Sequence, residues 1–501
     1  MKRLFILMLI LLLGLVGCTV PQGETISLSV KGKVQVKVGD TTLLSASSTN
    51  VIWESLDESI ATVSENGLVE GVKVGTTFIR ASLTTSAAVF DQVTLEVIAG
   101  STCTPNCDDC PAIDPGDVNV KLGIDLIDEN LSLFEGKNVG LITNPTGINS
   151  QYESTIDVLY EKVNLVALFA PEHGIRGNLQ AGASASTYTD EKTGLPVYSL
   201  YGSTMRPTAQ MLEGIDIMCI DLQDAGARFY TYVYTMAYAM EECAKYGIEF
   251  VVFDRPNPIG GAQYEGNILD TAYSSFIGLY PILQRHGLTI AELAMLFNEE
   301  FDLNVTLHTI AMEGWDRRYY YDDTKLPWVI PSPNFPSIET AMVYPGTCIF
   351  EGTNLSEGRG TTIPFQVIGA PYINADDWAE ALNALNLPGV AFRPAYFTPT
   401  FSKNKDLLCA GVQVHVTDRT LFEPVKTGWA MLDVVRNMYP ADFRILNAST
   451  NRNTMDLITG GRFITLDTYS LEEQFALIAS DSEAFNATRM QYLLYPYPTG
   501  E

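Results

Sequence analysis

The sequence predicts a protein of the α/β class, with a mostly parallel sheet, a smaller α+β region after it and a β-sandwich before it. Three observations predict this arrangement. Between residues 121 and 346, short apolar runs alternate with amphipathic stretches of helical length, which favours parallel strands joined by helices. Short β-rich runs fill residues 26–98. In residues 347–501, strand and helix patterns are mixed, as in a smaller α+β domain.

Residues 1–18 have the pattern of a targeting signal. Lys2 and Arg3 precede an apolar run from Leu4 to Val16, which is too short for a comfortable membrane span. The run ends in Leu15-Val-Gly-Cys18, which resembles a bacterial lipoprotein signal and would leave Cys18 as the lipid-bearing N-terminus. The alternative is an ordinary secretory signal with an incidental cysteine. We expect an extracytoplasmic protein that is lipid-anchored to the bacterial membrane or envelope.

A β-sandwich is expected over residues 26–98, because turn residues such as Gly39-Asp40 and Asn66-Gly67 separate its β-rich runs. The expected strands are Ser27–Val30, Val34–Val38, Thr42–Ala46, Val51–Trp53, Ile60–Val63, Thr77–Arg80 and Val93–Val97. The wording of Val51-Ile-Trp-Glu-Ser55 and of residues 66–75 resembles a bacterial Ig-like domain of group 2. Such domains are usually spacers or adhesion modules, and no catalytic residue stands out in this one.

Residues 99–120 have the composition of a linker, with Pro, Gly and Asp at a density that rarely packs into a core. Cys103, Cys107 and Cys110 lie in it. A three-cysteine cluster can hold a metal, but zinc prefers four ligands and no histidine is near. One disulfide with an odd thiol is an equally good interpretation, and the sequence leaves the pairing open.

The α/β region divides into expected strands and helices. Apolar runs predict buried strands at Val139–Thr143, Leu165–Ala170, Ile215–Ile220, Ile248–Phe253 and Asn304–Ile310. Amphipathic stretches predict helices at Glu153–Tyr160, Pro207–Glu213, Tyr232–Tyr246 and Leu288–Phe301. Thr289 is expected to cap the last helix, with Glu292 completing a capping box. Farther on, we expect helices at Asp376–Leu385 and Val425–Met438 and a strand at Gly411–Val416.

Composition and missing motifs exclude several function classes. The 31 basic and 59 acidic residues give a net charge of −28, which argues against a nucleic-acid partner because phosphates need a basic surface. The sequence has no P-loop, no G-x-G-x-x-G, no G-x-S-x-G and no H-E-x-x-H. The chain contains four histidines, too few for a multi-histidine metal centre. We expect no cofactor and no metal.

Polar loops bent by Gly or Pro follow the first four expected strands, and they predict an active site at one edge of the sheet. An open α/β sheet binds its ligands at the carboxyl ends of its strands. The loops are Asn144-Pro-Thr-Gly147, Pro171-Glu-His-Gly-Ile-Arg-Gly177, Asp221-Leu-Gln-Asp-Ala-Gly-Ala-Arg228 and Asp254-Arg-Pro-Asn-Pro258. Glu172 has a further reason to be reactive, since it lies between Pro171 and His173 directly after an apolar strand.

Carboxylates and arginines in these loops point to sugar chemistry. A pair of carboxyl groups in a cleft is the equipment for cleaving a glycosidic bond, one of them held protonated by a partly apolar pocket. Arginines bind carboxylates through two parallel hydrogen bonds, which suits an acidic substrate. The alternatives stay open: each acid can instead cap a helix or brace a loop, each arginine can pair with a neighbouring aspartate, and the aromatic rings can belong to the core.

Together, the loop motifs resemble the NamZ family of exo-β-N-acetylmuramidases over about residues 121–499. Besides the four loops, the shared motifs are Leu200-Tyr-Gly202, Phe229-Tyr-Thr-Tyr232, Pro331-Ser-Pro-Asn334 and Phe350-Glu-Gly-Thr-Asn-Leu-Ser-Glu-Gly-Arg-Gly-Thr361. The resemblance implies a Rossmann-like N-terminal domain at residues 121–346, a smaller C-terminal domain at residues 347–501 and an active site between them. It also implies release of N-acetylmuramic acid from the non-reducing end of peptidoglycan fragments.

On this basis Glu172, with His173, is the candidate for the catalytic acid. Its partner carboxylate is Asp224, Glu351 or Glu357, which the sequence does not rank. The candidates for binding a peptidoglycan-derived saccharide or muropeptide are Asn144, Arg176, Asp221, Arg228, Tyr230, Asp254, Arg255, Asn257, His286, Asn334, Asn354 and Arg359. The competing hypothesis is a surface lipoprotein that binds such fragments without cleaving them; the complete set of acidic motifs favours the enzyme.

Overall fold

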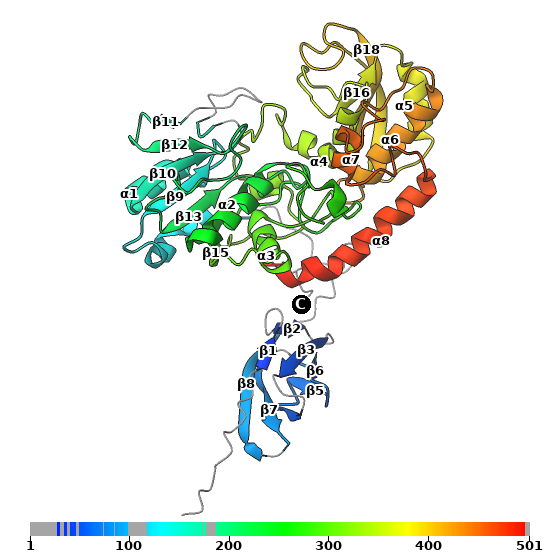
Figure 1. Cartoon of the computed structure of the whole chain (residues 1–501). Coiled ribbons are helices and arrows are strands. Elements are labelled where there is room, and N and C mark those ends of the chain that lie inside the picture. Colours follow the sequence, from blue (N-terminus) through cyan, green and yellow to red (C-terminus); the bar gives the residue numbers. More distant parts are fainter. Residues whose placement is uncertain are drawn as a thin grey trace, which may run out of the picture. The chain divides into compact units, whose positions relative to one another are not determined.

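The computed structural model describes residues 28–30, 35–37, 41–46, 50–73, 75–84, 86–98, 118–172, 174–176 and 187–495 (Figure 1). Cys18 with its signal, the three linker cysteines and His173 lie outside these ranges. The chain divides into two compact units, residues 1–102 with 499–501 and residues 103–498, and each is described by itself.

The N-terminal unit is a β-sandwich of two four-stranded sheets, in the orders β1-β3-β6-β5 and β2-β8-β7-β4. The strands are β1 (Leu28–Val30), β2 (Gln35–Lys37), β3 (Thr41–Ala46), β4 (Val51–Ser55), β5 (Ala61–Val63), β6 (Leu68–Gly71), β7 (Gly75–Leu83) and β8 (Ser86–Ile98). Buried residues from both sheets, including Leu44, Val69, Ile79 and Leu95, form one core. The sequence did not predict β6, because this four-residue strand lies between turn glycines.

The larger unit is built on a seven-stranded sheet in the order β11-β12-β10-β9-β13-β14-β15. The strands are β9 (Val139–Thr143), β10 (Leu165–Ala170), β11 (Tyr188–Thr189), β12 (Pro196–Ser199), β13 (Ile217–Asp221), β14 (Glu249–Phe253) and β15 (Leu307–Ile310). All are parallel except β11, which pairs antiparallel with β12 at the edge. In chain order the parallel strands have the 3-2-1-4-5-6 arrangement of a Rossmann sheet, so the Rossmann-like fold is confirmed.

Helices cover both faces of this sheet. They are η1 (Gly123–Leu133), α1 (Thr155–Lys162), α2 (Tyr232–Tyr246) and α3 (Ile290–Glu300). Every residue of β9 and β13 is buried, and successive side chains alternate between two cores: Leu141 packs with η1 and α1, and Ile142 packs with α2 and α3. Both faces are therefore closed to ligands, and the site must lie at the ends of the strands.

The ends of these helices follow their capping residues. Thr289 accepts a hydrogen bond from Glu292 N, and the Glu292 side chain accepts from Thr289 N, so the expected capping box at α3 is confirmed. Gly247, with φ of 68°, ends α2 in the left-handed conformation that a side chain disfavours. The prediction of a helix at Pro207–Glu213 is wrong. This stretch forms turns, because seven residues bracketed by turn signals are too few to sustain a helix without tertiary support.

The C-terminal part of this unit carries a three-stranded antiparallel sheet in the order β16-β18-β17. Its elements are α4 (Ile338–Thr347), η4 (Cys348–Gly352), β16 (Val367–Ala370), α5 (Ala375–Asn383), β17 (Val390–Phe397), β18 (Cys409–Val416), α6 (Pro424–Met438), α7 (Thr454–Thr459) and α8 (Leu471–Arg489). Helices α4 and α6 cross in contact at Gly346 and Gly428, where a Cβ on Gly428 would lie 2.2 Å from Gly346 O. The long helix α8 then leads back toward α3 (Figure 1).

The last described residues return to the Rossmann-like sheet. Tyr495, which is 7% exposed, donates a 2.6 Å hydrogen bond to Asp254 Oδ2 and accepts one from Met312 N. Leu494 N donates to Glu292 Oε1 at 2.8 Å. The C-terminal segment therefore completes the packing below β14 and α3.

Candidate active site

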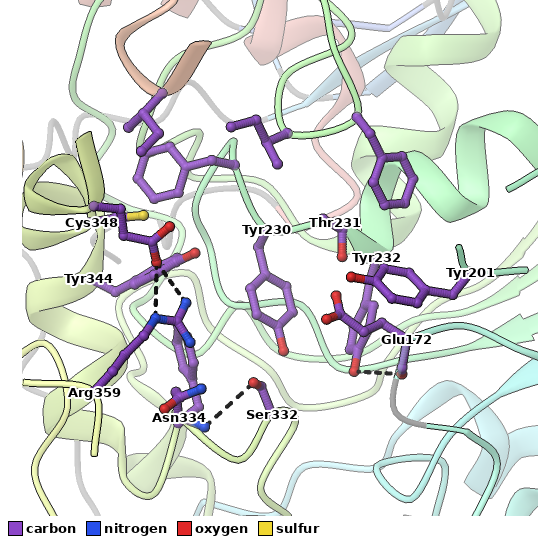
Figure 2. A pocket seen from close by; sticks show the side chains of 16 residues that line it. Glu172, Tyr201, Tyr230, Thr231, Tyr232, Ser332, Asn334, Tyr344, Cys348 and Arg359 are labelled. Carbon is purple, nitrogen blue, oxygen red and sulfur yellow. Dashed lines mark hydrogen bonds and ion pairs between the residues drawn. The ribbon is translucent and has the colours of Figure 1, made fainter. Parts of the chain in front are cut away.

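A pocket of about 300 Å³ lies where the loops after β10, β12 and β13 meet the segment from α4 to Arg359 (Figure 2). Its lining combines carboxylates, phenols and an arginine with an apolar portion: Glu172, Tyr201, Phe229, Tyr230, Thr231, Tyr232, Phe276, Ile277, Ser332, Asn334, Phe335, Tyr344, Cys348, Glu351, Arg359 and Ile458. Figure 2 shows Glu172 and Tyr201 on one side, Arg359 and Tyr344 on the other, and Tyr230 between them.

Glu172 is placed in the pocket by the turn that follows β10. The strand ends at Ala170, and Gly174 N donates to Pro171 O at 3.3 Å, which closes the turn around Glu172. Gly174 has a φ of 74°, a conformation that glycine adopts without strain. Tyr201, from the loop after β12, faces Glu172. Burial raises the pKa of Tyr201, and the negative charge and hydrogen bond of Glu172 raise it further. The Tyr201 phenol therefore stays protonated and serves as a donor to the carboxylate.

A group of aromatic rings forms the wall between the two sides of the pocket. The rings of Tyr230 and Tyr232 meet edge to face, with centroids 4.9 Å apart, and Phe335 packs on Tyr230 at 5.2 Å. Tyr232 donates a 2.6 Å hydrogen bond to Pro331 O. Burial raises the pKa of both tyrosines. The phenols therefore remain neutral, and this wall offers ring surface and hydroxyl groups without charge.

Glu351 and Arg359 form an ion pair on the opposite side of the pocket. Arg359 Nη2 lies 2.6 Å and Nε 3.2 Å from Glu351 Oε1, and both side chains are about a quarter exposed. Glu357 lies behind them, 1% exposed, with Lys403 Nζ 2.9 Å from Oε2 and Arg359 Nε 3.4 Å from Oε1. Of the three partner carboxylates considered from the sequence, Glu351 lines the pocket, whereas Asp224 and Glu357 do not.

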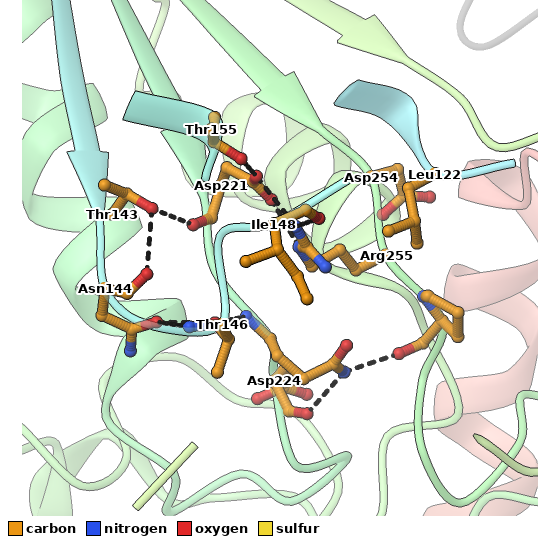
Figure 3. Close-up of polar contacts among 12 residues, drawn as sticks. Leu122, Thr143, Asn144, Thr146, Ile148, Thr155, Asp221, Asp224, Asp254 and Arg255 are labelled. Atoms are coloured by element: carbon orange, nitrogen blue, oxygen red, sulfur yellow. Dashed lines mark hydrogen bonds and ion pairs between the residues drawn. The ribbon is translucent and has the colours of Figure 1, made fainter. Parts of the chain in front are cut away.

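Asp221 and Arg255 lie in the interior and bind each other (Figure 3). Arg255 donates to Asp221 through Nε and, at 2.9 Å, through Nη2, which also donates to Ile148 O at 2.6 Å. The Thr155 hydroxyl donates to Asp221 as well. Their exposed fractions are 0% and 2%. The two side chains join the loops after β9, β13 and β14, and neither lines the pocket. That both bind substrate stays a prediction.

Three further candidates are also buried and do not line the pocket: Arg228, Asp254 and Asn257. Arg228 donates to the carbonyls of Asn267, Ile282 and Ile458 at 2.7–3.0 Å. Asp254 accepts from Thr289 Oγ1 at 2.8 Å and Ala291 N at 3.0 Å, at the start of α3, and burial raises its pKa to about 7. Asn257 Nδ2 donates to Leu288 O at 2.9 Å. These hydrogen bonds hold the three side chains within the protein, and their expected substrate role stays a prediction.

Asp224 and His286 form a second buried pair, with His286 Nε2 3.2 Å from Asp224 Oδ2. Leu288 N donates to His286 Nδ1 at 3.2 Å. His286 has no exposed surface and Asp224 is 3% exposed. Asp224 is one of the charges close to the Tyr230 phenol, so this pair stands behind the aromatic wall and not in the pocket.

The remaining candidates divide between pocket and scaffold. Asn334 lines the pocket with Tyr230 and Arg359. Arg176 binds Asp190 through two hydrogen bonds of 2.8 and 2.9 Å, and this arginine lowers the pKa of Asp190 to about 2. Asn144 folds its own turn by accepting from Thr146 N at 2.9 Å, and Asn354 accepts from Arg444 N at 2.9 Å. These three contacts are scaffold contacts.

Several lining residues of the pocket were not predicted from the sequence. Tyr201 lies in the Leu200-Tyr-Gly202 motif, so a signal was present. Phe276, Ile277 and Ile458 carry no such signal, because apolar residues of a loop and of a short helix look like ordinary core. In the described part of the chain, no cluster of three or more His, Cys, Asp or Glu side chains is arranged to hold a metal ion. None of the described helices is both long enough and apolar enough to cross a membrane.

The fold and the pocket define a class: a Rossmann-like α/β protein with a smaller C-terminal part, whose shared pocket presents carboxylates, phenols and an arginine. Comparison with known families agrees. Residues 139–339 match the model described as exo-beta-N-acetylmuramidase NamZ, N-terminal, and residues 342–495 match its C-terminal model. The chain therefore belongs to the NamZ family. Residues 19–97 match the bacterial Ig-like domain of group 2.

Individual relatives agree with this assignment. The chain is 50% identical to the peptidoglycan beta-N-acetylmuramidase NamZ of Bacillus subtilis over 382 residues, which is 75% of this chain and 91% of the relative. Two crystal structures of DUF1343 family proteins from Bacteroides fragilis each match 76% of this chain and all of theirs. Their TM-scores are 0.70 and 0.60, at 39% and 30% identity. An Ig-like domain joined to a family that acts on peptidoglycan indicates an extracytoplasmic protein.

Proposed function

We propose that the protein is an exo-acting glycoside hydrolase that releases N-acetylmuramic acid from the non-reducing end of peptidoglycan fragments. The observation that carries the proposal is the position of Glu172 and the Glu351–Arg359 pair on opposite sides of one pocket of about 300 Å³. That volume is at the lower end of ligand pockets, which suits one terminal sugar better than the interior of a long chain.

Glu172 is proposed as the essential carboxyl group of the reaction. It is placed by a tight turn after β10, and it is contacted by Tyr201. Glu351 is proposed as the second carboxyl group, because it shares the pocket with Glu172. A pair of carboxyl groups flanking the glycosidic bond is what hydrolysis requires: one protonates the leaving oxygen, and the other stabilises or attacks the sugar carbon or activates water.

The rest of the lining supports recognition of N-acetylmuramic acid. Its lactyl carboxylate needs a cation, and Arg359 brings one into the pocket. Its ring and methyl groups need apolar surface, which Phe276, Ile277 and Ile458 supply beside the tyrosine wall. Asn334 adds amide hydrogen-bonding capacity.

The test is turnover of a chromogenic N-acetylmuramic acid glycoside by wild type and Glu172→Gln, with binding of free N-acetylmuramic acid measured in parallel. We expect Glu172→Gln to lose at least about a hundredfold in kcat while sugar binding stays within a few fold. Equal turnover by the variant would remove Glu172 from the chemistry. Binding without turnover by the wild type over long incubation would instead favour a fragment-binding lipoprotein.

We infer in addition that Cys18 carries a lipid and anchors the protein to the membrane. The sequence Leu15-Val-Gly-Cys18 supports this, as does the extracytoplasmic character of the domains. Full-length protein should partition into detergent phase and incorporate labelled fatty acid, and Cys18→Ala should do neither. Labelling of the variant at the wild-type level would contradict the anchor.

A further inference from the structure

A second pocket, of about 390 Å³, lies on the C-terminal three-stranded sheet. It is lined by Thr361, Thr362, Ile363, Val367, Arg393, Pro394, Ala395, Tyr396, Phe397 and Gln413. Residues Phe392, Val412 and Val414 of β17 and β18 belong to the hydrophobic core. Side chains alternate along a strand, so Arg393 and Gln413 lie on the face of the sheet opposite that core.

The two pockets share one loop. Arg359 lines the first pocket and Thr361 lines the second. Two residues of chain span at most about 7 Å between Cα atoms, so the pockets are neighbours. The loop is held in place: Gly360, with φ of 84°, accepts hydrogen bonds from Thr400 N at 3.0 Å and from Thr400 Oγ1 at 2.9 Å. A Cβ on Gly360 would lie 2.7 Å from Phe401 N, so this close approach requires glycine.

The chemistry of the second pocket suits an anionic ligand. Its lining contains Arg393 and no carboxylate. Arg393 is exposed. In the described part of the chain its Nη2 donates a 2.6 Å hydrogen bond to Oε1 of Gln413, a neutral side chain. In a chain with a net charge of −28, an exposed arginine without a carboxylate partner is a cation still available for an external anion. The Gln413 contact fixes the guanidinium, which lowers the entropy cost of binding.

The same pocket also carries features suited to a sugar. Phe397 lines it and lies four residues after Arg393 in β17, on the same face of the sheet, so its ring is available for stacking on a saccharide. Thr361 and Thr362 add two hydroxyl groups from the shared loop. An aromatic ring, hydroxyls, an amide and one arginine together fit a carboxylate-bearing saccharide better than a neutral one.

We propose that this pocket binds the next N-acetylmuramic acid of the same glycan strand. The inference rests on the proposed function. In the alternating strand, one N-acetylglucosamine separates the terminal muramic acid from the next, and the shared loop keeps the two pockets close enough for one strand. Arg393 holds the lactyl carboxylate of the inner muramic acid, and Phe397 packs on its ring. The pocket thereby selects strands of more than two sugars.

The test uses the peptide-free disaccharide GlcNAc-β-1,4-MurNAc. It carries the carboxylated sugar, yet it cannot be cleaved by an enzyme that removes terminal muramic acid, so calorimetric binding is read without turnover. We expect chitobiose, its neutral counterpart, to bind about tenfold more weakly, and Arg393→Gln to lose about tenfold for GlcNAc-MurNAc and nothing for chitobiose. Lys245→Gln, an exposed cation lost from α2, is the matched control and should bind as wild type.

Two further variants keep the result interpretable. Phe397→Ala should weaken both disaccharides, and Lys405→Gln, which removes an exposed cation outside both pockets, should leave GlcNAc-MurNAc binding unchanged. Wild-type affinity in Arg393→Gln, or equal binding of both disaccharides, would overturn the proposal. Tighter, Arg393-dependent binding of an isolated stem peptide would overturn it in favour of a peptide site. A wild type that binds GlcNAc-MurNAc but never cleaves a muramic acid glycoside would refute the proposed function alone.

Discussion

Arg255 and Asp221 bind each other in the interior at the carboxyl ends of β14 and β13, with Nη2 2.9 Å from Oδ2 and exposed fractions of 2% and 0%. The pair closes the point of the Rossmann-like sheet where the strand order reverses, between β9 and β13. Rossmann proteins generally bind ligands at this point. Here the ion pair and the Asn144 turn fill it, and the pocket lies farther along, beside the loops after β10 and β12.

Arg255→Gln should therefore destabilise the protein without a specific effect on substrate binding. Removing one partner of a buried ion pair leaves Asp221 uncompensated, and we expect the free energy of unfolding to fall by about 3–5 kcal/mol. Urea unfolding measures this loss. The KM of the fraction that remains folded should stay within about twofold of wild type. A tenfold rise in KM at an unchanged free energy of unfolding would instead show that Arg255 contacts the substrate.

Tyr201→Phe should lower kcat about tenfold with little change in KM. The variant keeps the ring and removes the hydroxyl that contacts Glu172, and a hydrogen bond to a charged group contributes about 1.5–3 kcal/mol. Steady-state kinetics on a muramic acid glycoside measure the split. Tyr198→Phe is the matched control, because Tyr198 lies in β12 and packs on Phe169 outside the pocket. Equal loss in both variants would point to a general packing effect.

Tyr495→Phe should lower the free energy of unfolding by about 1–2 kcal/mol. The variant removes the donor to Asp254 and the acceptor for Met312 N, both buried, and unpaired buried polar groups are costly. Tyr492→Phe removes a contact to Glu300 at the surface, and we expect a loss below about 0.5 kcal/mol. Denaturant unfolding of the two variants compares them directly, and equal losses would contradict a special role for Tyr495.

The raised pKa of Asp254 predicts that the free energy of unfolding falls as pH rises from about 4 to about 7. Burial raises the pKa of Asp254 to about 7 in the folded state, whereas the ordinary value is 3.8. Between these values the folded state binds more protons than the unfolded state, so the free energy of unfolding decreases with rising pH and levels off above the folded pKa. Asp254→Asn should remove this component. Unfolding measured at pH 5 and pH 8 should differ less in the variant than in wild type; an unchanged difference would exclude Asp254 as its source.

Apolar and amphipathic patterns in the sequence predicted the bounds of several elements. Val139–Thr143 and Leu165–Ala170 have the bounds expected of them, because a mostly apolar run has few alternatives in a parallel sheet, and Tyr232–Tyr246 has the bounds expected from its amphipathic pattern. The sequence also led to the loops that surround the pocket. It could not separate lining residues from supports, because a polar residue after a strand can turn outward or inward, and the direction depends on partners far away in the chain. Arg228 shows this: its partner Ile458 lies 230 residues later.

The bond between Asp254 and Tyr495 links residues 241 positions apart, so the packing of the large sheet is completed by a residue far along the chain from its strands. Until residues 494 and 495 have left the ribosome, the Asp254 carboxyl group after β14 and the Glu292 side chain of α3 lack their final hydrogen-bond partners. Complete folding of this unit must therefore wait until residues 494 and 495 are available. A premature stop codon that removed only the segment after α8 would leave every pocket residue encoded and still deprive the sheet of the contacts that complete it.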